Sequence, residues 1–107
     1  MAPLLRTFSA LSDETRLTIV EQLMDHGELP AGDLVRGSGI SAPAISRHLK
    51  VLREAGLIEQ RADGTRRLYS ARPEGIQLIA NWTISRRDFW NSSLDRLEAA
   101  IREEELE

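Results

Sequence analysis

The chain has 107 residues and a net charge of −3, and its length is that of one small domain with a modest core. Hydrophobic residues make up 41% and charged residues 29% of it, a balance that excludes a disordered chain and indicates an ordinary globular protein. The absence of cysteine excludes disulfides and thiolate metal ligands, and the lack of a signal-peptide pattern and of a membrane-length apolar run predicts a cytoplasmic protein with no membrane partner.

Two helices are predicted at the start of the chain. Residues 4–11 have the pattern of a short amphipathic helix. Ser12 is expected to cap a second helix, because Asp13 and Glu14 follow it in the first turn, where the helix dipole favours carboxylates. This helix should end before Gly27. Its predicted core face consists of Leu17, Ile19, Val20, Leu23 and Met24.

Residues 31–55 have the pattern of a helix-turn-helix. A short helix is expected from Pro30 to about Arg36, and the Gly-Ser-Gly of residues 37–39 breaks it. The next helix has Ser41 as its N-cap, Pro43 in its first turn and Gly56 just beyond its end. A narrow apolar stripe predicts that this helix packs by one edge and exposes its cationic and hydroxyl groups. The stripe consists of Ile45, Leu49 and Leu52.

A β-hairpin is predicted over residues 57–71. Two strand-like runs, residues 57–61 and 66–71, flank Asp63-Gly64, which is a strong hairpin signal. A helix-turn-helix followed directly by a basic hairpin is the pattern of a winged helix. The arginines near the hairpin tip are Arg61, Arg66 and Arg67.

Residues 73–104 are predicted to form one long helix or two helices with a kink near residue 84. The apolar stripe of this region is longer than a small domain can easily cover, and part of it repeats at the spacing of a coiled-coil seam. We therefore expect a symmetric homodimer formed through the terminal helices. An effector pocket between those helices is the alternative interpretation of the aromatic residues. The predicted interface residues are Leu4, Leu5, Phe8, Trp82, Phe89, Trp90, Leu94, Leu97 and Ile101.

These elements predict a mainly α fold with a small β-hairpin, in the order α-α-α-α-β-β-α, as a single domain over residues 1–107. The charge is unevenly divided along it. Residues 41–72 hold seven Lys and Arg against three Asp and Glu, whereas residues 1–40 and 84–107 each carry a net charge of −3. Binding responds to the local field, so the basic third of the chain predicts an anionic partner despite the acidic total.

The sequence resembles the ArsR/SmtB family of bacterial winged-helix repressors. The resemblance rests on F-S-A-L-S-D-E-T-R-L-T-I-V at residues 8–20, on S-A-P-A-I-S-R-H-L-K-V-L-R-E-A-G-L-I at 41–58 and on R-A-D-G-T-R-R-L-Y-S at 61–70. It implies a winged helix-turn-helix homodimer that binds operator DNA and releases it on a signal.

The sequence departs from the metal-sensing members of that family. Where such members resemble E-L-C-V-C-D-L, residues 28–34 read E-L-P-A-G-D-L, with Pro30 and Gly32 in place of the cysteines. Zinc-binding members need histidine and carboxylate clusters in the C-terminal helices, and residues 73–107 contain no histidine. We therefore expect no metal and no cofactor. The signal is left open between an unidentified small-molecule effector and a protein effector.

Double-stranded operator DNA is the predicted partner, with the helix of residues 41–55 in the major groove and the hairpin on the backbone or in the minor groove. Arg47 is the best candidate for base readout, whereas Lys50 and Ser41 are expected to reach phosphates. His48 is interpreted either as a satisfied core or interface histidine or as a phosphate contact. The predicted DNA-binding residues are Ser41, Pro43, Ala44, Ser46, Arg47, Lys50, Arg61, Arg66 and Arg67.

The predicted function is therefore transcriptional regulation, with repression of a pseudo-palindromic operator as the expected mode. The competing interpretation is a winged helix that docks proteins without DNA, which would need an apolar or acidic helix face instead of a basic one. Catalysis is not expected, because the chain has no phosphate loop, metal-ligand cluster or nucleophile motif.

Overall fold

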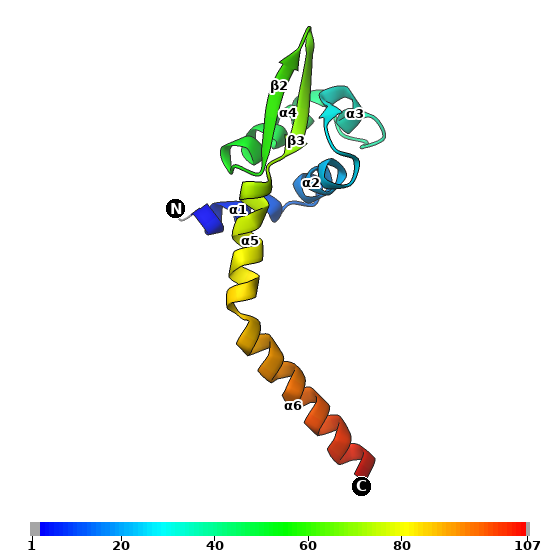
Figure 1. The fold of residues 1–107 in the computed structure, drawn as a ribbon. Helices are drawn as coiled ribbons and strands as arrows, with labels where there is room; N and C mark the ends of the chain where they lie inside the picture. The colour runs from blue at the N-terminus through cyan, green and yellow to red at the C-terminus, as the bar shows by residue number, and fades with distance from the viewer. Residues whose placement is uncertain (1–2, 107) are drawn as a thin grey trace.

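The computed structural model describes residues 3–106 and has a winged helix-turn-helix fold, as predicted (Figure 1). Met1, Ala2 and Glu107 of the predicted 1–107 domain lie outside the described residues. One short strand, β1, is added to the predicted order. The elements are α1 (Pro3–Leu11), α2 (Glu14–His26), β1 (Leu29–Pro30), α3 (Ala31–Val35), α4 (Ala42–Glu54), β2 (Ile58–Asp63), β3 (Arg66–Ala71), α5 (Pro73–Ser85) and α6 (Arg87–Leu106).

The N-cap of α2 is Asp13, and the prediction of Ser12 was wrong. Asp13 has an extended backbone, with φ −120° and ψ 133°, and its carboxylate accepts a hydrogen bond of 3.0 Å from the amide of Arg16. The Ser12 hydroxyl instead donates to the carbonyl of Ser9 at 2.7 Å, at the C-terminal end of α1. Ser12 therefore caps the C-terminal end of α1, and Asp13 caps the N-terminal end of α2.

The buried face of α2 is narrower than predicted. Ile19, Val20 and Leu23 are each 2% exposed, but Leu17 is 42% and Met24 is 56% exposed, so their assignment to the core was wrong. At 3.6 residues per turn, both lie roughly a quarter turn or more around the helix from the centre of the buried stripe.

Helix α4 begins and packs as predicted. Ser41 is its N-cap, with φ −65° and ψ 152°, and its hydroxyl oxygen accepts a hydrogen bond of 3.3 Å from the amide of Ala44. The stripe of Ile45, Leu49 and Leu52 is at most 2% exposed. Gly56 follows the helix with φ +76°, a conformation that L side chains rarely adopt.

The sheet is antiparallel, with the strand order β1-β3-β2. In the hairpin Asp63 pairs with Arg66, so the turn consists of Gly64 and Thr65, and β2 runs two residues beyond the predicted end at Arg61. Strand β1 has only two residues, one of them Pro30, which is too short a run to be recognised as a strand. It joins the helix-turn-helix to the inner edge of the wing.

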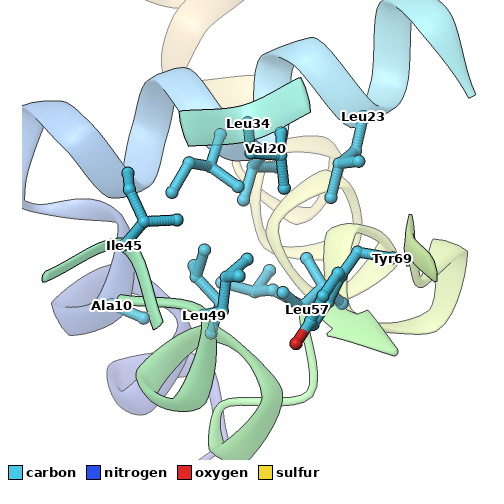
Figure 2. Close-up of a cluster of buried hydrophobic side chains, with 11 residues drawn as sticks. Ala10, Val20, Leu23, Leu34, Ile45, Leu49, Leu57 and Tyr69 are labelled. Atoms are coloured by element: carbon cyan, nitrogen blue, oxygen red, sulfur yellow. The ribbon is translucent and has the colours of Figure 1, made fainter. Parts of the chain in front are cut away.

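The core lies where α2, α3 and α4 meet the base of the sheet (Figure 2). Leu52 and Leu57 are fully buried, and Tyr69 of β3 is 7% exposed, so the wing is anchored to the helices by its base. The buried cluster consists of Ala10, Ile19, Val20, Leu23, Leu34, Ile45, Leu49, Leu52, Leu57, Ile58 and Tyr69.

The C-terminal region forms two helices, and Arg86 separates them with φ −104° and ψ 17°. Helix α5 begins against the turn after α4, so closely that a Cβ on Gly75 would collide with the carbonyl oxygen of Gly56 and lie 3.1 Å from the Cα of Leu57. Helix α6 then projects from the winged unit as a stalk and buries none of its residues (Figure 1). The described chain measures 68 × 30 × 22 Å as a result.

Candidate nucleic-acid interface

The N-terminal half of α4 presents a polar surface opposite its buried stripe. Ala44 is half-buried, while the side chains that flank it on this surface are exposed. This is the surface that sequence analysis predicted to contact DNA. The exposed members are Ser41, Pro43, Ser46, Arg47 and Lys50.

The two cations of this surface differ in their surroundings. The ammonium of Lys50 lies 4.0 Å from the carboxylate of Glu54, one helical turn further along, in an exposed and weak ion pair. Within residues 3–106, Arg47 makes no ion pair. Its guanidinium therefore has all of its donors available to an external acceptor.

The three wing arginines lie on different faces of the hairpin. Arg61 and Arg66 share one face, because Arg61 pairs with Leu68 and Arg66 pairs with Asp63, and Arg67 points to the other face. All three are exposed. Arg66 lies 4.0 Å from the carboxylate of Asp63.

Arg61 forms a salt bridge with Glu28, which lies between α2 and β1. The guanidinium donates two hydrogen bonds of 2.7 Å, from Nε to Oε2 and from Nη2 to Oε1. The side-chain hydrogen bond from Arg61 is the main reason why the pKa of Glu28 is lowered, and the same bond raises the pKa of Arg61. Sequence analysis grouped Arg61 with the wing-tip cations, whereas the structure places it at the attachment of the wing to the helices.

Arg36 is a cationic residue near the wing that sequence analysis missed. It follows α3, pairs with Asp33, and lines an open groove of about 480 Å³ together with Arg66 and Arg67 of the wing. An arginine in the turn of a helix-turn-helix is the sequence signal that could have found it. We call it the α3–wing groove. It is lined by Pro30, Ala31, Gly32, Asp33, Arg36, Thr65, Arg66 and Arg67.

The predicted interface residues lie on α1, α5 and α6, and all of them except Leu4 are exposed. Phe8 of α1 packs edge-to-face against Trp82 of α5, with ring centroids 5.8 Å apart, and Leu4 beside them is half-buried. On α6, Phe89 and Trp90 also pack edge-to-face at 5.4 Å. The exposed fractions are Leu5 58%, Phe8 39%, Trp82 42%, Phe89 59%, Trp90 52%, Leu94 61%, Leu97 58% and Ile101 50%.

His48 lies on the flank of α4 toward α1 and α2, not on the surface around Arg47. Its Nδ1 is 3.4 Å from the guanidinium of Arg16 and 3.8 Å from the carboxylate of Asp13, and its side chain is 24% exposed. These contacts favour the interpretation of His48 as a satisfied histidine between elements.

Residues 3–106 contain no group of three His, Cys, Asp or Glu side chains that could hold a metal ion. In the same residues, no helix is long and apolar enough to cross a membrane.

Comparison with known proteins points to one family. The model of the bacterial regulatory protein, arsR family, matches residues 13–60. The HTH-type transcriptional regulator Rv2034 of Mycobacterium tuberculosis is 47% identical over 74 residues, which cover 69% of this chain and 68% of that protein. The arsenical resistance operon repressor of Escherichia coli is 37% identical over 99 residues, which cover 92% of this chain and 81% of the repressor.

A solved structure resembles most of this chain. The domain from Mycobacterium bovis described as a homodimeric winged helix-turn-helix DNA-binding domain, of a possible ArsR-family regulator, superposes with a TM-score of 0.64 at 25% identity. The superposition covers 81% of this chain and 82% of that one.

Proposed function

This chain belongs to the ArsR family of bacterial regulatory proteins, and we propose that it is a homodimeric transcriptional repressor that binds a pseudo-palindromic operator through α4 and the wing. The observation that carries the proposal is the uncommitted guanidinium of Arg47, exposed on the N-terminal half of a capped helix in the basic third of the chain. In this proposal the protein acts by binding DNA in the cytoplasm and not by catalysis.

Helix α4 enters the major groove by its N-terminal half. Small side chains at Ala44 and Ser46 let the backbone approach the base edges, and Arg47 bonds a guanine through O6 and N7. Ser41 and Lys50 bond phosphates on either side and fix the register of the helix. The positive end of the helix dipole adds to the attraction for phosphate.

The wing supplies backbone contacts. Arg66 and Arg67 lie on opposite faces of the hairpin tip, so one faces the backbone of the groove that α4 occupies while the other reaches toward the minor groove. Arg36 lines the α3–wing groove together with Arg66 and Arg67 and makes a further phosphate contact. Arg61 contributes mainly by holding the wing in place through Glu28. Binding through these cations releases counterions and therefore weakens steeply with salt.

Dimerisation covers the apolar surface of α1, α5 and α6. In proteins most of the stability of a helix comes from tertiary packing, and α6 buries none of its residues within residues 3–106. Its seam of Trp90, Leu94, Leu97 and Ile101 has the spacing that packs against a second copy. The named relative from Mycobacterium bovis is a homodimer, which supports the same assembly here.

The proposal is tested by selecting duplexes that the full chain binds from a random DNA library. Enrichment of an inverted repeat, with half-sites about one helical turn apart, is expected. A selection that ends with no enriched sequence, at a salt concentration where the protein binds DNA, would overturn it. That result would favour the alternative, a winged helix that docks proteins without DNA. This alternative would be tested by measuring whether the binding of a protein partner is insensitive to salt.

A further inference from the structure

Arg16 forms a polar junction between three helices. Its backbone amide is fixed by the carboxylate of Asp13 at the start of α2. Its guanidinium reaches back to the C-terminal end of α1, where Nε donates to the carbonyl of Ala10 at 2.6 Å and Nη2 to that of Ser9 at 3.5 Å. Carbonyls in the last turn of a helix lack partners within the helix. The Ser9 carbonyl also accepts from Ser12, whereas Arg16 supplies the bond to Ala10 and places a cation at the negative end of the dipole of α1.

The same guanidinium also reaches α4, the recognition helix that is proposed to enter the major groove. Nη1 of Arg16 lies 3.4 Å from Nδ1 of His48, in the middle of α4. A guanidinium can only donate, so this contact is a hydrogen bond in the tautomer of His48 whose Nδ1 is the acceptor. The carboxylate of Asp13 lies 3.8 Å from the same nitrogen. One planar side chain therefore connects α1 with α4, which are not consecutive in the chain.

Close packing does not fix these two helices to each other along their whole length. An open groove of about 320 Å³ separates α1 from the C-terminal half of α4. Its walls carry Arg6, Ser9 and Ala10 on one side and Val51, Glu54 and Ala55 on the other. Because the two helices do not pack directly across this groove, the bonds of Arg16 are polar contacts that help to hold the angle between them.

We propose that Arg16 is a positioning residue that fixes the angle between α1 and the recognition helix, and thereby sets the half-site spacing that the dimer accepts. Helix α1 packs against α5 through Phe8 and Trp82, on the side where the second copy binds. The separation of the two recognition helices in the dimer therefore depends on how α4 is held to α1. This inference rests on the proposed function.

The test compares the wild-type chain with Arg16→Lys on duplexes that carry two selected half-sites at the preferred spacing or displaced by one and two base pairs. Lysine keeps the charge but cannot bond α1 and His48 at once. Arg16→Lys is expected to lose about threefold to tenfold of the preference for one spacing, the range of one hydrogen bond. Dimer mass and affinity for random DNA should stay unchanged. Arg6→Lys, on the wall of the same groove, is the matched control.

A spacing preference in Arg16→Lys that matches that of the wild type within twofold would overturn the inference while leaving the proposed function standing. If the wild type itself does not distinguish half-sites from random DNA, the proposed function and the inference both fail.

A second pair of variants keeps the test valid if Arg16→Lys does not fold. His48→Gln retains a hydrogen-bond acceptor for Arg16, whereas His48→Leu has none. His48→Leu should broaden the spacing preference and His48→Gln should restore it, with the same salt dependence of binding in both. Equal spacing preferences in the two variants would overturn the inference. A salt slope lowered in both by about one would also overturn it and would assign His48 to phosphate contact instead.

Discussion

Arg61 donates two parallel hydrogen bonds of 2.7 Å to the carboxylate of Glu28, although the two residues lie 33 positions apart in the chain. The pair joins the outer strand of the wing to the segment between α2 and β1. Planar, two-point pairing of this kind fixes orientation as well as distance. The direction of the wing relative to α4 therefore depends on a residue, Glu28, that contacts no DNA in the proposed complex.

Glu28→Gln should weaken DNA binding by about twofold to fivefold, which is the range for losing one exposed ion pair. The amide oxygen still accepts one hydrogen bond from Arg61, but the charge and the two-point geometry are lost, so the wing tip becomes less ordered. Titration of labelled operator measures the effect. Glu59→Gln is the control, since Glu59 is an exposed acidic residue of the same strand. An equal change of affinity in both variants would show that the Glu28–Arg61 pair does not orient the wing on DNA.

The Glu28–Arg61 pair should also make stability depend on acid pH. The pKa of Glu28 is lowered in the folded chain, mainly by the hydrogen bond from Arg61. The pair therefore stabilises the folded state fully above the ordinary glutamate pKa of about 4.3, and this contribution is lost as the pH falls through the lower folded-state value. Thermal unfolding of wild type and Glu28→Gln should differ at neutral pH and converge in acid. A difference that persists below the folded-state pKa would contradict this account.

Gly75→Ala should destabilise the chain by about 1–3 kcal/mol, because the added methyl would collide with the carbonyl oxygen of Gly56 and push α5 away from the α4–β2 turn. Gly32→Ala is the matched control within another helix. Its Cβ would meet the nearest atom, on Arg36, at 3.8 Å, so this change should be neutral or stabilise by up to about 1 kcal/mol. Urea unfolding of both variants measures the difference, and equal midpoints would show that α5 can move without cost.

The sequence was sufficient for the helices, their order and most of their ends. Ser41 and Gly56 bound α4 through local chemistry that involves only neighbouring residues, and the stripe at Ile45, Leu49 and Leu52 has the period of a helix packed by one edge. The choice of Asp13 over Ser12 as a cap was missed, because both residue types cap helices and only the path of the backbone decides between them.

Relationships between distant segments were not predictable in this way. The pairs Arg61–Glu28 and Arg16–His48 join residues more than 30 positions apart, and no local pattern in the sequence identifies either of them. Strand β1 exists because β3 offers it an edge, not because its two residues favour a strand. The DNA-binding and interface residues stay predictions, which the following two experiments test.

Leu97→Asp should weaken self-association at least about tenfold, because it would place an unpaired carboxylate in the apolar seam of α6. Leu97 is 58% exposed in the single chain, so the folding of the winged unit should be unaffected. Sedimentation velocity at several concentrations measures the monomer–dimer equilibrium. Asp95→Asn, two residues away and outside the seam, is the control. A dimer of unchanged strength in Leu97→Asp would mean that the second copy does not cover α6.

The most direct measurement is a fluorescence titration of the full chain, wild type and Arg47→Ala, against the selected operator and a shuffled duplex of equal length, at several salt concentrations. We predict that wild type binds the operator more tightly at every salt concentration. Arg47→Ala should lose about 1–3 kcal/mol on the operator and much less on the shuffled duplex. Equal affinity of wild type for the two duplexes, or an equal loss on both in Arg47→Ala, would contradict the claim that α4 reads the operator sequence.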